Sequence, residues 1–254
     1  ACGSFRREGE FDGGDSSRMR EFVAACLGCA LAIGLTASAE TEPAIVLPAP
    51  LASLDIANSS EGAYPGGSTP IRGKWFVEKS AKKLKLAVEP LEIGWLEFGP
   101  EIRERGATIR VLARAPGEGR LRSRMGAGLY GKNGFQVRVD QGKRVVELVR
   151  RGIVLQSVEF STDPEALSEI ELSVIENDED WDVSARVWVY ESDRPHEPLL
   201  QHRAYGDELL FPLAGRPCLV ATPFSGESVQ YAMARVFDGD PYAPVEEVEG
   251  EVPE

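Results

Sequence analysis

Apolar and polar residues alternate along the stretch from Gly106 to Phe160. Ile109, Val111 and Ala113 recur at every second position, and the segment from Gly134 to Asp140 repeats the pattern. A period of two places one set of side chains on a buried face and the other in water, which is typical of half-buried β-strands. The stretch therefore predicts four or five strands joined by turns, to which the rest of the chain adds further strands.

The same alternation predicts where the other strands lie. Turn-forming residues separate them, as at Pro116–Gly119 and Lys132-Asn133-Gly134. Trp95 and Phe98 are expected in the core, and residues 176–180 are expected to form a loop. The expected strands cover residues 74–78, 83–88, 95–98, 107–115, 123–130, 134–140, 144–150, 153–160, 170–175, 183–190, 216–222 and 229–237.

Many short strands, no internal repeat and almost no helix predict an all-β fold, a two-sheet antiparallel β-sandwich of the jelly-roll type. A closed barrel is the alternative. The chain has 254 residues, of which 43% are hydrophobic, enough for a sizeable core. We expect the sandwich domain over residues 71–238, a linker or edge segment over 40–70, and an acidic disordered tail over 239–254. Residues 1–18 are expected to be a non-native or upstream segment.

The chain before residue 40 has the features of an export signal. Arg20 precedes an apolar run of 14 residues, Phe22–Leu35, and Ala37-Ser38-Ala39 is a small-x-small cleavage pattern. We expect a signal peptide over residues 19–39, cleaved after Ala39, and a secreted or periplasmic mature chain. A retained N-terminal anchor is the alternative. After cleavage no membrane span is expected, because the apolar run is too short for one and lies in the removed segment.

Cysteine and histidine are scarce. Three of the four cysteines precede the expected cleavage site, so Cys218 is alone in the mature chain and is expected to be a small buried hydrophobe. Cys26 and Cys29 have poor contexts for lipidation, which makes a lipoprotein the less favoured alternative. With His196 and His202 as the only histidines, a structural zinc site is not expected.

Several segments together resemble the concanavalin A-like, laminin G-like sandwich. They are Trp75-Phe76-Val77-Glu78, Leu84-Lys85-Leu86, Gly134–Val139, Val187-Trp188, Pro195-His196-Glu197-Pro198 and Tyr231–Phe237. Within that superfamily the chain is similar to bacterial secreted domains of the 3-keto-disaccharide hydrolase type. The resemblance covers about residues 70–240 and implies a carbohydrate-associated, extracytoplasmic jelly roll. Because the superfamily includes enzymes, lectins and adhesion modules, the resemblance does not choose among them.

Charge is unevenly distributed along the chain. Residues 102–151 contain 13 basic and 4 acidic side chains, whereas residues 154–207 contain 14 acidic and 3 basic ones. If strands from both segments mix in one sheet, these charges pair across strands and serve solubility. The alternative is a concave face that binds an anionic or hydroxyl-rich glycan and is lined by Arg110, Arg114, Arg124 and Arg138. Nucleic acid is a poor candidate for a secreted chain with a net charge of −13.

Aromatic side chains offer apolar faces against which sugar rings pack. Trp188 and Tyr190 point away from the core on the predicted strand, and Tyr130 is expected on a neighbouring strand. Burial in the other sheet is the competing interpretation. Gln136 and Arg138 are expected to add polar contacts. The candidate ligand-binding residues are Arg110, Arg124, Tyr130, Gln136, Arg138, Trp188 and Tyr190.

The acidic residues do not predict a catalytic pair. Glu176, Asp178 and Asp180 lie where the apolar alternation has stopped, so a turn is expected to carry them, and a turn does not hold two carboxylates at the separation a glycosidase needs. These three residues are instead candidate Ca²⁺ ligands, with simple solvation as the alternative. Glu169 and Glu171 share a strand face that we expect to be exposed to solvent.

Taken together, the sequence predicts a secreted, non-catalytic module that binds a polysaccharide or another glycan, or that mediates cell-surface contacts, as a monomer. No catalytic residue is assigned, and Ca²⁺ is the one cofactor considered. A hydrolase of the same fold, acting on glycosides or 3-keto-glycosides, is one alternative. A purely structural surface protein is another.

Overall fold

The computed structural model describes residues 47–87, 89, 92–117, 122–178, 180–205, 209, 212–224 and 227–243. The predicted signal peptide, residues 1–18 and tail residues 244–254 lie outside this part of the chain. The only helical element among the described residues is the 3₁₀ turn η1 (Gly131–Asn133). No described helix is therefore long and apolar enough to cross a membrane.

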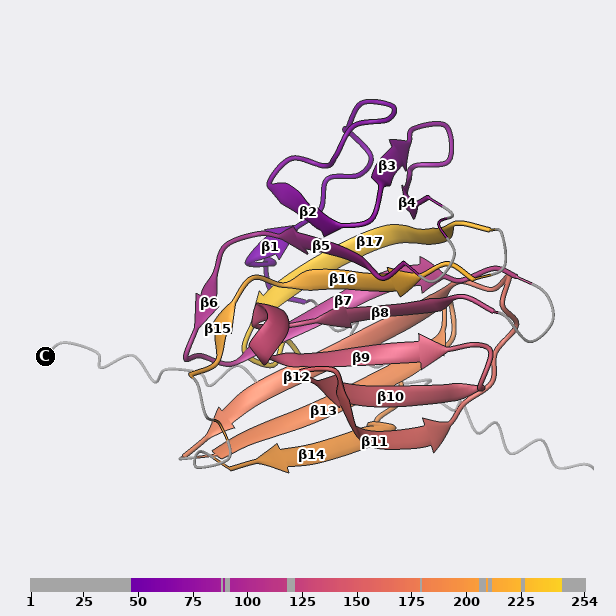
Figure 1. Ribbon diagram of the computed structural model, residues 1–254. Helices are drawn as coiled ribbons and strands as arrows, with labels where there is room; N and C mark the ends of the chain where they lie inside the picture. Colours follow the sequence, from indigo (N-terminus) through magenta and orange to yellow (C-terminus); the bar gives the residue numbers. More distant parts are fainter. Residues whose placement is uncertain are drawn as a thin grey trace, which may run out of the picture. The chain divides into compact units, whose positions relative to one another are not determined.

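The described strands form two large antiparallel sheets that pack face to face, as Figure 1 shows. The eight-stranded sheet has the order β14-β13-β12-β7-β17-β4-β3, with β1 pairing β17. Its strands are β1 (Ala52–Ser53), β3 (Trp75–Glu78), β4 (Lys83–Leu86), β7 (Ala107–Arg114), β12 (Ser168–Asn177), β13 (Asp180–Val189), β14 (Leu200–Ala204) and β17 (Val229–Asp238). This arrangement confirms the predicted two-sheet sandwich and excludes the closed barrel.

The seven-stranded sheet has the order β11-β10-β9-β8-β16-β5-β2. Its strands are β2 (Ser68–Arg72), β5 (Gly94–Phe98), β8 (Arg124–Gly128), β9 (Phe135–Asp140), β10 (Val145–Arg150), β11 (Ile153–Glu159) and β16 (Cys218–Thr222). A short ladder joins β6 (Ile102–Arg103) to β15 (Ala214–Gly215) beside the two sheets. Consecutive strands β7 and β8 belong to different sheets, so the chain changes layer between them.

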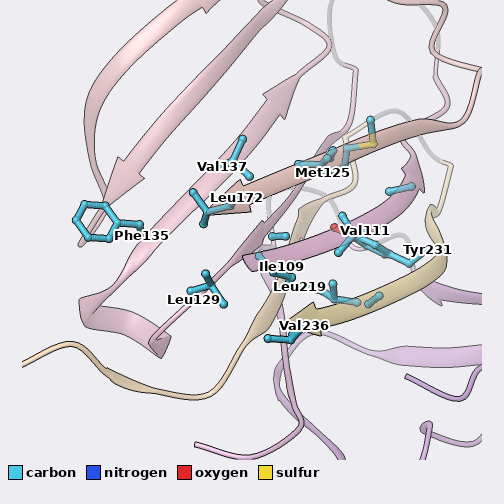
Figure 2. Close-up of a cluster of buried hydrophobic side chains, with 14 of the residues drawn as sticks. Ile109, Val111, Met125, Leu129, Phe135, Val137, Leu172, Leu219, Tyr231 and Val236 are labelled. Carbon is cyan, nitrogen blue, oxygen red and sulfur yellow. The ribbon is translucent and has the colours of Figure 1, made fainter. Parts of the chain in front are cut away.

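The core lies between the sheets and is built by the predicted alternation. In the eight-stranded sheet, Leu172 lies opposite Ile109 on the neighbouring strand, and both side chains are fully buried. Val137 and Leu219 face them from the seven-stranded sheet and belong to the same cluster (Figure 2). Burial of apolar side chains from both layers is the main force that holds the sheets together.

Tyr231 adds a polar connection across this core. Its ring contacts Trp75, with 5.9 Å between ring centroids, and its hydroxyl lies 2.9 Å from the carbonyl oxygens of both Gly126 and Val220. The Gly126 N–H also donates to the hydroxyl at 3.2 Å. A side chain of the eight-stranded sheet thus bonds the backbone of the opposite sheet.

Some elements differ from the sequence-based expectation. Residues 176–180 do not form a loop, because β12 and β13 continue to a tight hairpin in which Asn177 pairs with Asp180. The strands β2 and β14 were not predicted, since Pro70 interrupts the first and polar residues dominate the second. Residues ahead of the expected domain start also enter the fold: β1 pairs β17, and Leu54 and Ile56 are buried.

Candidate functional site

Two outward-facing side chains in the middle of the seven-stranded sheet are shielded from solvent. On β9 the alternation that buries Phe135 and Val137 turns Gln136 and Arg138 outward. Gln136 is nevertheless only 2% exposed, and outward-facing Cys218 on the neighbouring part of the sheet is 0% exposed. Neighbouring groups therefore cover these two side chains, and a hollow in the surface lies beside Gln136.

The hollow is a cavity of about 560 Å³, which we call the Arg138 pocket. It draws side chains from β2, β5, η1, β9 and the β10–β11 turn, so it extends across the outer face of the sheet, over β16 and β8. Its volume is in the range of small-ligand sites. The lining residues are Ile71, Arg72, Ile93, Trp95, Lys132, Asn133, Gln136, Arg138, Arg151 and Gly152.

Because Gly128 has no side chain, the side chains of Gln136 and Cys218 can lie close to its backbone. A Cβ atom at this position would lie 2.8 Å from Cγ of Gln136 and 2.9 Å from Sγ of Cys218. Real Cβ atoms do not come so near to other heavy atoms, so a larger residue would push Gln136 away from its place in the pocket. Burial also raises the pKa of the Cys218 thiol, which keeps it protonated under the pocket.

The guanidinium of Arg138 is bonded to an amide. Its Nε and Nη2 donate to Oε1 of Gln136 at 3.2 and 2.6 Å. Glu147 lies opposite Arg138 on β10, but its carboxylate bonds Nζ of Lys143 at 3.3 Å. Within the described residues, no carboxylate oxygen lies within 4.0 Å of the Arg138 guanidinium. Burial lowers the pKa of Arg138 and the charge of Glu147 opposes this shift, so the guanidinium is only partly compensated.

The structure separates the four arginines that were expected to line one face. Arg110 and Arg114 lie on β7 in the eight-stranded sheet, whereas Arg124 and Arg138 lie on β8 and β9 in the other. Three of the four are paired: Arg110 with Glu169, Arg114 with Glu165 at 3.6 Å, and Arg124 with Asp140 at 2.6 Å. For these three arginines, the interpretation that charges pair across strands holds, and not the interpretation that they line one glycan-binding face.

The expected aromatic residues do not come together either. Trp188 faces outward from β13, as the alternation predicted, but it is 5% exposed and lies under Arg110, whose Cζ is 5.2 Å from the ring centroid. Tyr190 is exposed just beyond the same strand. Tyr130 is fully buried and donates its hydroxyl proton to the carbonyl of Arg105 at 2.6 Å, and burial raises its pKa. None of the three lines the Arg138 pocket.

Trp95 is buried, as expected, but it belongs to a small cluster separate from the core between the sheets. It was expected in one core with Phe98, and the alternation within β5 instead turns Leu96 and Phe98 toward the main core and Trp95 toward the outer face. Its indole packs with Cys218 and Val220 on the outer face and lines the pocket. The period-two pattern of Gly94–Phe98 contained this signal.

Glu169 and Glu171, expected on a solvent face, are buried beneath other groups of the eight-stranded sheet. The carboxylate of Glu171 is 1% exposed and accepts hydrogen bonds from Arg186 at 3.2 Å and from Arg194 at 2.6 and 3.0 Å. Arg194 also stacks on Tyr242, 3.7 Å from its ring centroid.

Tyr242 belongs to the segment expected to be a disordered tail. Its hydroxyl accepts a hydrogen bond from Nη1 of Arg110 at 2.7 Å, and burial raises its pKa. Gly239 adds two backbone contacts, to Gly106 and to the hydroxyl of Thr108. Residues 239–243 are therefore fastened over the eight-stranded sheet.

The acidic hairpin carries the candidate Ca²⁺ ligands. Glu176 lies in β12, Asp178 occupies the turn with φ of 56°, and Asp180 pairs with Arg203 at 3.0 Å. Nearby, Asn177 bonds Asp182. Among the described residues no group of three or more His, Cys, Asp or Glu side chains is placed to hold a metal ion.

Comparisons with known proteins address the fold. The carbohydrate recognition domain of Emp46p, in a point-mutant form, superposes with a TM-score of 0.55 at 14% identity, over 76% of this chain and 98% of that one. The corresponding domain of Emp47p gives 0.53 at 14% identity, over 76% and 98%. The lectin UEA-II, in complex with galactose, gives 0.50 at 7% identity, over 76% and 100%. The chain has a concanavalin A-like sandwich fold. No family model and no curated protein sequence matches it.

In this concanavalin A-like sandwich, the Arg138 pocket lies on the outer face of the seven-stranded sheet, and residues 239–243 cover part of the outer face of the eight-stranded sheet. Emp46p is also known in potassium-bound and metal-free forms. At these identities the similarity establishes the fold alone.

Proposed function

We propose that this protein is a non-catalytic carbohydrate-binding module and that the Arg138 pocket is its glycan site. One observation carries the proposal: on one hollowed sheet face, an indole, an amide and a guanidinium line the same cavity of about 560 Å³. The structural neighbours are carbohydrate recognition domains and a galactose-bound lectin, which supports the proposal.

The chemistry of the lining suits a sugar. The apolar side of a pyranose ring packs against aromatic and aliphatic surface, which exposed Ile71 and Ile93 provide together with the 9% of Trp95 that solvent reaches. Sugar hydroxyls both donate and accept hydrogen bonds, and Asn133 and Gln136 have amides that do the same. Such a mixture of apolar surface with a few fixed polar groups is typical of ligand sites.

We further propose that the protein acts outside the cytoplasm as a monomer, after cleavage following Ala39. The basic segment, apolar run and small-residue cleavage pattern of residues 19–39 support export. N-terminal sequencing of the protein recovered from the outside of producing cells tests this step, and a mature chain that begins at Glu40 is the expected result.

Glycan binding is tested by affinity electrophoresis of the protein through gels that contain single polysaccharides. Asn133→Ala and Trp95→Ala are expected to weaken retention on the retarding polysaccharide. Asn133 is exposed, so its substitution is expected to leave the fold unchanged. Trp95 is buried, so the melting temperature of Trp95→Ala is measured as well, to separate loss of binding from loss of folding. Trp188→Ala is the matched control, because Trp188 lies on the other sheet and its loss is expected to lower stability without changing retention. Equal retention of all variants contradicts the proposed site.

A hydrolase is the second candidate function, favoured by one observation. Glu97 and Glu101 line a cavity of about 330 Å³ that shares Lys132 and Asn133 with the Arg138 pocket. Glu97 accepts a hydrogen bond from Trp95 at 3.3 Å, and exposed Glu101 pairs with Arg103 at 2.9 Å. Release of reducing sugar or keto-sugar from disaccharides, lost in Glu97→Gln, would establish catalysis and overturn the binding-only function.

A further inference from the structure

We propose that the Arg138 pocket selects acidic glycans and binds a carboxylate or sulfate group of the sugar against the Arg138 guanidinium. This inference rests on the proposed function and specifies its ligand class. It follows from the charge of the pocket, from the partners of its basic groups and from the shape of the lining.

The pocket is strongly basic in an acidic protein. Arg72, Lys132, Arg138 and Arg151 line it, and among the described residues no acidic side chain does. The whole chain has a net charge of −13. Like charges destabilise one another, so Arg72, Lys132 and Arg138 around one cavity favour an anion that occupies it. Elsewhere the excess of acidic residues repels polyanions, which directs them to this site.

Basic groups on the opposite sheet are neutralised by contrast. Arg110 pairs with Glu169, and Arg186 and Arg194 share Glu171. In the described part of the chain, the side chains of Arg72, Lys132 and Arg138 have no carboxylate oxygen within 4.0 Å. These three basic side chains around the cavity are thus left for an anion that enters it.

Arg138 is oriented without being neutralised. The neutral side-chain carbonyl of Gln136 accepts two of its five N–H groups, which fixes the plane of the guanidinium and leaves other donors for a ligand. Because Arg138 is partly buried, its interaction with an anion is screened less by water than it would be at an exposed site. A planar guanidinium matches the two oxygens of a carboxylate or sulfate.

The shape of the pocket favours a sugar over other polyanions. Trp95, Ile71 and Ile93 provide an apolar wall beside the cations, which suits a ring that carries a charge. Exposed Arg72 and Lys132 lie at the rim, where they attract the approaching chain. A nucleic acid would instead need a continuous basic surface along its backbone.

The test compares acidic and neutral polysaccharides by affinity electrophoresis of the full chain. Polygalacturonate supplies carboxylates, dextran sulfate supplies sulfates, and dextran and laminarin are neutral. We expect retention by at least one acidic chain, weakened by added salt. Arg138→Gln is expected to weaken that retention about tenfold and exposed Lys132→Gln about two- to fivefold. Arg235→Gln is the control, since it removes the same charge from an exposed position on the outer face of the eight-stranded sheet.

The outcomes separate this inference from the proposed function. Retention by neutral chains alone, or equal retention of acidic and neutral chains, overturns the acidic preference and leaves glycan binding in place. An equal effect of Lys132→Gln and Arg235→Gln places the charge recognition outside the pocket and also overturns it. Retention by none of the polysaccharides refutes both proposals. Retention by double-stranded DNA as strong as by the acidic glycan shows general polyanion binding and contradicts the sugar-specific site.

Discussion

Gln136 holds Arg138 in place on the outer face of the seven-stranded sheet, with both Nε and Nη2 of the arginine directed at one amide oxygen, 3.2 and 2.6 Å away. The two residues are separated by one position on β9, so the pleat of the strand places them on the same side. A neutral acceptor orients a cation without cancelling its charge. This relationship makes Arg138 available to an external anion.

Replacing this acceptor by a carboxylate should remove that availability. Gln136→Glu has almost the same shape and brings a negative charge to the Arg138 guanidinium, so it is expected to abolish retention by acidic polysaccharides while the protein stays folded. Affinity electrophoresis together with urea unfolding measures both effects. Unchanged retention by the acidic chain would show that Arg138 does not contact the anionic group.

The hydroxyl of Tyr231 should contribute measurably to stability. Tyr231→Phe removes the hydrogen bonds to Gly126 and Val220 in a fully buried setting, and a loss of about 1–2 kcal/mol in the free energy of unfolding is expected. Urea denaturation with an unchanged m-value measures it. Tyr190→Phe is the control and should change nothing, since Tyr190 is exposed. Equal midpoints for the two variants would refute the role of the cross-core bonds.

Glu171 should be needed to fasten residues 239–243. Glu171→Gln leaves Arg186 and Arg194 without their carboxylate, and a destabilisation of about 2–3 kcal/mol is expected, less than for a fully buried pair because both guanidiniums keep some contact with water. Arg194 also stacks on Tyr242, so losing the partner of Arg194 should loosen residues 239–243. Faster proteolysis near Tyr242 should therefore accompany the destabilisation.

Exposed Glu101, paired with Arg103, is the control for this change. Glu101→Gln is expected to leave the free energy of unfolding within about 0.5 kcal/mol of the parent. If Glu171→Gln behaves in the same way, Glu171 does not stabilise the C-terminal segment.

Stability should decline at alkaline pH. Burial raises the pKa values of the Cys218 thiol and of the Tyr231 hydroxyl above their ordinary ranges. The unfolded chain therefore releases these protons at lower pH than the folded chain does. The stabilisation is complete below the unfolded pKa values and is lost progressively above them, from about pH 8.5 upward, as the pH rises toward the raised pKa values of the folded chain. Thermal unfolding as a function of pH measures the decline.

Cys218→Ala removes the thiol contribution to this loss of stability. The variant should therefore lose less stability than the parent protein over the pH range between the ordinary pKa of a thiol and that of tyrosine, where only the thiol of the unfolded chain titrates. The parent protein should also resist thiol reagents at Cys218 until it unfolds, as peptide mass analysis after labelling would show. Labelling of native Cys218 at the rate of a free thiol would contradict its burial beneath the pocket.

The fold was largely accessible from the sequence because its signals are local. Alternation located most of the strands within about two residues, and turn residues located most of the hairpins. Predictions failed where local signals are weak. Polar β14 has little apolar periodicity, and β2 contains Pro70, which is tolerated there because β2 is an edge strand.

The candidate site was only partly accessible. Gln136 and Arg138 were predicted together and line one pocket, whereas Arg110 and Trp188 were predicted with them and lie on the other sheet. Trp95 was predicted to be buried, which it is, but its place beside the pocket was missed, although its position in the alternation indicated the outer face. The burial of Glu171 depends on Arg194 and Tyr242, which approach it from distant parts of the chain.

The sequence by itself determined which side chains face inward and which face outward on most strands, because a period of two is a property of the extended backbone and needs no partner. Only the tertiary structure decided which outward-facing residues share a surface. The chain changes sheets between β7 and β8, and this step separates Arg110 from Arg138. One of these arginines is thereby neutralised by Glu169, while the other remains free of a protein carboxylate among the described residues. Pairing between strands distant in sequence creates that difference, and no local pattern encodes it.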